Sequence, residues 1–259
     1  MNNDCLSVIF SFLEMNDIGN CRLTNKQFNR IIVTRYDWLG LCRKKYAGIT
    51  DYLRQKTPYN TYILCVALHK IYDYFHYKSW SCIWPDTVMS LYNTKVFDKS
   101  CNETNKQLPK QIGFLSKLTN IWLPMGSLTV LPTEIGQLTA LQVLNVSGNM
   151  LVEIPNEIGK LVNLQVLNLS KNKISRIPDE VYQLTKLETF EYQHNPISHI
   201  SNDIYNLVNI KTLGLSIDGK LPNKLVQMTM LYSLKISGKN VKISKKLSER
   251  PGLEIIQFH

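Results

Sequence analysis

The sequence predicts an α/β solenoid with parallel strands on its concave face and short helical or extended segments on its convex face, preceded by an all-α N-terminal domain. Three rows of apolar residues carry this prediction. Leucines and isoleucines recur with a constant 23-residue period through the second half of the chain, at Leu108, Leu131, Ile154, Ile177 and Ile200. Two further rows, which begin at Leu115 and Leu118, run in phase with the first. Such self-similarity means that each repeat buries its apolar edge only against its neighbours.

One repeat, residues 141–155, shows how the elements are expected to follow each other. Leu141, Leu144 and Val146 alternate with polar residues, which predicts a short strand with its apolar side chains inward. The later phrase I-P-x-E-I-G-x-L predicts a short helical segment on the convex side, since proline suits a first helical turn. Asparagine follows three successive strands at the same offset, at Asn149, Asn172 and Asn195. We expect these side chains to be buried and to satisfy backbone groups of the turn that leaves the strand.

This pattern resembles the leucine-rich repeat family, in its 23-residue intracellular form. The resemblance implies that residues 106–259 form about six repeats, with a last strand in which Leu253, Ile256 and Phe258 supply the apolar positions. Two departures mark irregular turns. The first copy has Pro124 and Gly126 where the next copy has Ser147 and Asn149. The step from Ile200 to Leu221 is shorter than the others, with a loosened turn at Gly214, Asp218 and Gly219.

The concave sheet is the surface on which we expect a protein target to bind. The positions between the inward leucines project from it, and the residues expected to contact the target are Trp122, Asn145, Asn168, Glu191 and His194. An exposed indole at such a face is a typical anchor, although Trp122 can equally cover a seam with the N-terminal domain. For the rest of the face, a merely solvated sheet is the alternative interpretation.

In residues 1–45, apolar residues recur at helical spacing in three short segments. Three such helices would bury too small a core to be stable without a partner. The run from Leu6 to Leu13, the pair Asp17-Ile18 and the run from Leu23 to Phe28 resemble the F-box, a helical motif that docks onto a Skp-type adaptor of cullin ubiquitin ligases. The motif's Leu-Pro start falls on Met1-Asn2, and its Asp-Pro has become Glu14-Met15. The resemblance implies an adaptor-binding face formed by Leu6, Ile9, Phe10, Leu13, Ile18 and Phe28.

Residues 46–105 are rich in aromatic residues at helical spacing. We expect a helical linker that caps the solenoid and joins it to the F-box-like segment. Aromatic residues interleaved with lysines also occur in proteins that bind nucleic acid, but helical spacing favours a packed core.

Composition narrows the functional classes further. Of the net charge of +10, +7 arises between Lys211 and Arg250, a segment with nine basic residues and only two acidic ones, Asp218 and Glu249. Charge confined to one end favours a solvated cap over a nucleic-acid track. The six cysteines all precede the repeats without C-x-x-C spacing, so we expect reduced thiols and neither a metal site nor a cofactor. No apolar run approaches the roughly 20 residues of a membrane helix, and the N-terminus lacks a secretory signal, which predicts an intracellular protein without a membrane partner.

No catalytic set of residues is recognisable, because the five histidines lack acidic or thiol neighbours at catalytic spacing and there is no glycine-rich phosphate loop. The sequence therefore predicts a non-enzymatic substrate receptor, in which the F-box-like segment binds a Skp-type adaptor and, through it, a cullin. The alternative is a scaffold or decoy that binds a partner on its repeats without recruiting ubiquitin machinery.

Overall fold

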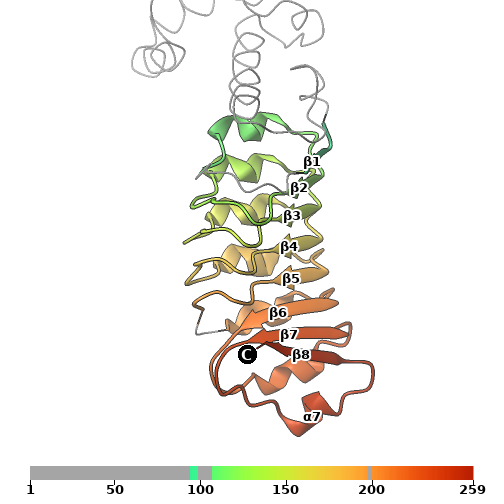
Figure 1. The fold of residues 1–259 in the computed structure, drawn as a ribbon. Coiled ribbons are helices and arrows are strands. Elements are labelled where there is room, and N and C mark those ends of the chain that lie inside the picture. The colour runs from blue at the N-terminus through green and yellow to red at the C-terminus, as the bar shows by residue number, and fades with distance from the viewer. Residues whose placement is uncertain (1–93, 99–106, 198–199, 259) are drawn as a thin grey trace, which may run out of the picture. The chain divides into compact units, whose positions relative to one another are not determined.

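The computed structural model describes residues 94–98, 107–197 and 200–258, and in them it confirms the predicted solenoid. A single eight-stranded parallel sheet runs in chain order from β1 to β8, and helical turns stack on its other side (Figure 1). The strands are β1 (Val96–Asp98), β2 (Asn120–Trp122), β3 (Val143–Asn145), β4 (Val166–Asn168), β5 (Thr189–Glu191), β6 (Thr212–Ser216), β7 (Ser233–Ser237) and β8 (Glu254–Phe258). The helical elements are the 3-10 helices η1 (Lys110–Phe114), η2 (Thr133–Gln137), η3 (Asn156–Lys160), η4 (Asp179–Gln183), η5 (Asn202–Asn206) and η6 (Asn223–Gln227), and the α-helix α7 (Lys245–Ser248).

The core lies between the sheet and the helical turns and is built from the leucine rows. One row, Leu118, Leu141, Leu164 and Leu187, has no solvent-exposed surface. Each fully buried leucine contributes about 1.5–3 kcal/mol relative to an exposed one. Because equivalent leucines of successive turns lie directly above one another, the stacked turns share one continuous core.

A proline and a glycine in each of several repeats shape the helical turns on the convex side. Pro132 immediately precedes η2 in extended conformation, and its carbonyl accepts the first helical hydrogen bond from Ile135 at 3.0 Å. Gly136 in the same helix lies so close to the next turn that a Cβ atom there would stand 2.6 Å from the Glu157 carbonyl oxygen. The I-P-x-E-I-G-x-L phrase therefore allows close stacking of neighbouring helical turns.

Two strands differ from expectation at the ends of the sheet. β1 lies within residues 46–105, where we expected only a helical linker, and its buried Phe97 pairs with Ile121 of β2. β8 forms where expected, but its side chains point to the opposite faces of the sheet from those predicted. Ile255, and not Ile256, lies in register with the buried Leu234 of β7. A slip of one residue turns every side chain of a strand to the other face, so Ile256 and Phe258 lie on the face opposite the core.

Candidate protein-binding surface

The register of the sheet gathers most of the predicted target-contacting residues into one line. Trp122 of β2 pairs with Asn145 of β3, which pairs with Asn168 of β4, and Asn168 pairs with Glu191 of β5. The line continues through Gly214 of β6 and Lys235 of β7. We call these six residues the central row: Trp122, Asn145, Asn168, Glu191, Gly214 and Lys235.

The two asparagines of the central row are occupied by contacts within the solenoid. The Oδ1 atom of Asn145 accepts a hydrogen bond from the Ser147 amide at 3.0 Å, and the Asn145 residue is only 9% exposed. The Oδ1 atom of Asn168 accepts from both the amide and the hydroxyl of Ser170, while its Nδ2 donates to Glu191 at 2.9 Å. These side chains hold the ends of β3 and β4 in place, and only Asn168 is also partly open to solvent.

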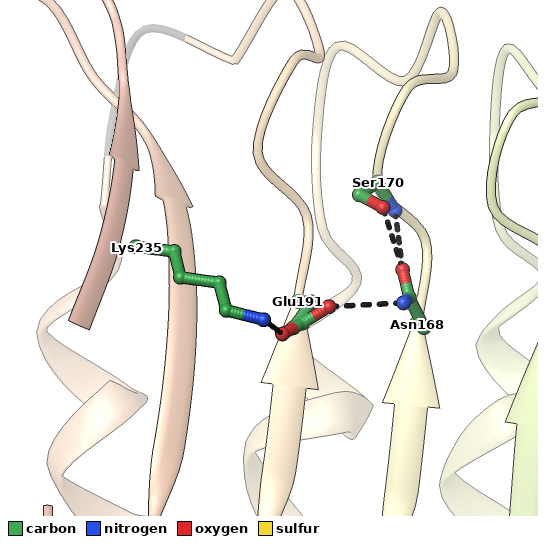
Figure 2. Close-up of polar contacts among 4 residues, drawn as sticks. All are labelled: Asn168, Ser170, Glu191 and Lys235. Atoms are coloured by element: carbon green, nitrogen blue, oxygen red, sulfur yellow. Dashed lines mark hydrogen bonds and ion pairs between the residues drawn. The ribbon is translucent and has the colours of Figure 1, made fainter. Parts of the chain in front are cut away.

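Glu191 and Lys235 form an ion pair that passes over an intervening strand. The Lys235 Nζ atom lies 2.5 Å from Glu191 Oε1, although the two residues belong to β7 and β5 (Figure 2). Figure 2 also shows that the other oxygen of Glu191 takes the hydrogen bond from Asn168. The Glu191 side chain is 9% exposed, so its charge requires these partners.

Gly214, on the strand between Glu191 and Lys235, leaves room for the side chain of Gln193. A Cβ atom at this position of β6 would lie 2.9 Å from Gln193 Cδ and 3.2 Å from Glu191 Cα. The Gln193 amide occupies the space that a side chain at position 214 would take. Its Oε1 atom is buried and has no hydrogen-bond partner among the residues that the structure describes. The C-terminal half of the central row is therefore closed by its own side chains.

The N-terminal half of the sheet face is more open. Trp122 is 39% exposed, and the neighbouring line of register pairs contains the half-buried Val143 and Val166. Gln142 and Gln165, which precede these valines, are exposed. We call Trp122, Gln142, Val143, Gln165 and Val166 the open strip, because they offer apolar area next to exposed amides.

His194 lies beyond the central row, in the turn that follows β5. Its backbone has a φ of 58°, and its ring lies 5.1 Å from the ring of Phe258 between centroids. Partial burial, together with the nearby charge of Lys171, lowers the pKa of His194 below its usual value. At neutral pH the imidazole is therefore mostly uncharged, and it offers both a hydrogen-bond donor and an acceptor.

The asparagines after the strands form the ladder that the sequence predicts. The Nδ2 atom of Asn172 donates to the carbonyls of Val146 and Leu169 at 3.0 and 2.9 Å, and its Oδ1 accepts from Leu151 at 3.0 Å. Asn149 and Asn195 repeat this pattern one turn before and one turn after, so the structural role predicted for these residues is confirmed.

Sequence reasoning did not identify Lys235 as the ion-pair partner of Glu191. The available signal was a pair of opposite charges at the same register position, two repeats apart, with glycine between them. The predicted adaptor-binding residues Leu6, Ile9, Phe10, Leu13, Ile18 and Phe28 lie outside the described residues.

Within the described residues, no group of three or more His, Cys, Asp or Glu side chains is arranged so that it could hold a metal ion. The same part of the chain has no helix of the length and apolarity needed to cross a membrane.

Comparisons with known families agree with both parts of the sequence. A model of the F-box domain matches residues 1–40. A leucine-rich repeat model matches residues 116–174, and a model described as a leucine-rich repeat region matches residues 156–258. No curated protein matches the chain.

Solved structures with similar folds include several receptors. The plant peptide hormone receptor RGFR1 in complex with RGF2 is 26% identical, with a TM-score of 0.51, over 68% of this chain and 34% of that one. A TDR receptor is 28% identical, with a TM-score of 0.50, over 59% of this chain and 28% of that one. The Arabidopsis receptor kinase HAESA, in complex with the peptide hormone IDA and the co-receptor SERK1, shares the fold at 24% identity and a TM-score of 0.57, over 67% of this chain and 31% of HAESA. The chain thus spans about a third of the length of these receptors or less.

Proposed function

Because this chain is an F-box and leucine-rich repeat protein, we propose that it is a substrate receptor of a Skp-cullin-F-box type ubiquitin ligase. Both families are protein-interaction modules. In this proposal the F-box binds a Skp-type adaptor, and through it a cullin, while the repeats hold a protein target. The chain itself performs no chemistry. It acts inside the cell by holding lysines of the target near a charged conjugating enzyme, which raises their effective concentration.

One observation supports the sheet face as the target surface: its side chains combine exposed apolar area with fixed polar groups. The open strip, which includes Trp122, supplies the apolar contacts, while the partly exposed Asn168 is held in place by its hydrogen bonds with Glu191 and Ser170. Binding surfaces typically place an aromatic anchor among such preorganised polar groups.

The layers that carry this surface are close to neutral, with eight basic and nine acidic residues between positions 101 and 210. The target is therefore recognised by shape and apolar contact more than by net charge. Lys239, Lys242, Lys245 and Lys246 lie at the C-terminal end, where we expect them to change association rate and salt dependence more than affinity.

The adaptor step can be tested directly with the purified full-length protein and a purified Skp-type adaptor. Wild type should co-elute with the adaptor, and a variant with both Ile9→Asp and Phe10→Asp should not, because charge on an apolar docking face prevents its burial. A matched control makes the same kind of change on the repeats. Val162→Asp with Val208→Asp alters two exposed valines and should leave co-elution intact.

The target step needs a partner captured by the wild-type repeats. Trp122→Ala should weaken capture at least tenfold, since truncating an aromatic anchor commonly costs about 2 kcal/mol or more. Lys245→Glu with Lys246→Glu should not do so. A wild-type protein that fails to bind the adaptor, yet captures a partner through Trp122, would instead establish the scaffold or decoy function.

A further inference from the structure

The asparagine ladder stops after Asn195, and the stop leaves a gap in the hydrogen bonding between turns. In the three preceding turns an asparagine accepts the backbone N–H that lies 21 residues before it: the N–H groups of Leu128, Leu151 and Ile174 are bound in this way. The next residue in the series is Asp218, whose Oδ1 instead accepts from the Lys239 amide at 2.7 Å. Ile197, whose N–H would be the next donor, makes no hydrogen bond to Asp218, and no described residue accepts from it.

The donor half of the missing asparagine is replaced only by long contacts. An asparagine at position 218 would donate to the carbonyls of Leu215 and Tyr192, by the spacing of the earlier turns. Those carbonyls are instead approached by the Ser237 and Ser216 hydroxyls, each at 3.4 Å. Contacts of this length are weak hydrogen bonds.

A second turn-to-turn bond is also lost at the same place. Met150 and Lys173 each donate their amide to a carbonyl of the previous turn at 2.8 Å. The equivalent residue in the next turn is Pro196, which has no N–H. With both bonds missing, the turn that follows β5 is joined to the next turns through serine hydroxyls instead, since Ser216 Oγ accepts from the Asn195 amide at 2.9 Å and Ser237 Oγ accepts from the His194 amide at 2.6 Å.

A hollow of about 460 Å³ occupies this break. His194, Pro196 and Ile197 line it from the turn after β5, and Asp218 and Lys239 line it from the next two turns. Ile197, whose N–H has no acceptor among the described residues, and Asp218, one of whose carboxylate oxygens is taken by the Lys239 amide, thus line the same hollow. The mostly uncharged imidazole of His194 stands at its side.

We propose that this hollow binds a carboxamide side chain, Asn or Gln, of a protein partner, which completes the ladder in place of the asparagine that the chain lacks. The amide oxygen of the partner accepts from the Ile197 N–H, and its NH2 group donates to the Asp218 carboxylate. A carboxylate in the partner is rejected, since it has no proton to donate and faces the charge of Asp218. The inference rests on the proposed receptor function only for the identity of the protein that carries the amide.

The test uses the full-length 15N-labelled protein and two small probes that differ in one group. N-acetyl-asparagine methylamide should shift the Ile197 amide resonance in a saturable manner, and N-acetyl-aspartate methylamide should not. Asp218→Asn supplies the amide within the chain, so it should weaken binding of the asparagine probe at least tenfold. It should also slow hydrogen exchange of the Ile197 amide toward that of Ile174. Asp203→Asn, the same charge change at an exposed position, should alter neither result.

Equal shifts of Ile197 with both probes would overturn the proposal, and so would unchanged binding of the asparagine probe by Asp218→Asn. Slow exchange of the Ile197 amide in the wild-type protein would also overturn it, because the donor would then already be occupied. None of these readouts involves the adaptor, so failure of this inference leaves the adaptor test unaffected.

Discussion

The side chain of Asn172 accepts the backbone N–H of Leu151, one turn earlier in the solenoid, at 3.0 Å. Both groups are buried, and the same side chain donates to two carbonyls of the strand ends. One amide thus satisfies backbone groups of two successive turns that water does not reach.

Replacing Asn172 with leucine should therefore destabilise the protein by about 2–4 kcal/mol, because Asn172→Leu leaves several buried polar groups without partners. Thermal or denaturant unfolding measures this loss. Asn156→Leu provides the control, because Asn156 is exposed on η3. Equal losses for the two variants would contradict a special role of the ladder position.

Gly214→Ala should destabilise the repeats, since the new methyl group would overlap the Gln193 amide and press on the Glu191 backbone. We expect a loss of about 1–3 kcal/mol, which is typical of overpacking. The double variant with Gln193→Ala should recover part of it, because it removes the amide that the methyl group meets. No recovery would place the strain in the β5 backbone instead.

Lys171→Gly should stabilise the protein. The residue has a φ of 55°, and the equivalent residue one turn earlier is Gly148, with a φ of 66°. A non-glycine residue in this left-handed region costs about 1 kcal/mol, which exceeds the entropy that glycine loses on folding. We expect a gain of up to about 1 kcal/mol in unfolding free energy. Lys173→Gly, at an exposed position without positive φ, should be destabilising, and a gain there too would refute the explanation.

Tyr192→Phe should keep or increase stability at neutral pH, by up to about 1 kcal/mol, because the buried Tyr192 hydroxyl has no partner among the described residues. Burial is the main reason that the pKa of Tyr192 is raised well above 10.0, and the electrostatic interaction with Tyr182 raises it further. The folded protein then keeps a proton that the unfolded chain releases, so stability falls as the pH rises above about 10. Tyr192→Phe should reduce this alkaline loss, whereas Tyr205→Phe, at a half-buried tyrosine, should change it less.

Sequence periodicity predicted the repeat core because burial itself follows the period of the sequence, as the row from Leu118 to Leu187 shows. It failed where the period changes. The last two strands pair at a spacing of 21, Ser233 with Glu254, so the apolar alternation at Ile256 and Phe258 indicated the wrong face. Phe97 stands outside the leucine rows, and β1 was therefore missed.

The sheet-face line from Trp122 to Glu191 followed directly from strand alternation. Which of its side chains stay available depends on contacts that span several repeats. The Lys235–Glu191 pair joins residues 44 positions apart across another strand, and no local pattern encodes such a distance.

The ladder bonds also determine how the length of the array can vary. Each asparagine contacts residues 3, 21 and 26 positions before it, whichever turn it belongs to. One whole repeat that is removed or duplicated between β3 and β5 therefore brings together neighbours that already fit. The span offered to a partner would change in steps of about 4.8 Å, the spacing of adjacent strands. After Asn195 the repeat length falls from 23 to 21 residues between β6 and β7, and Asp218 has a different hydrogen-bond partner from the asparagines. We therefore expect whole repeats to be duplicated more readily before Asn195 than after it.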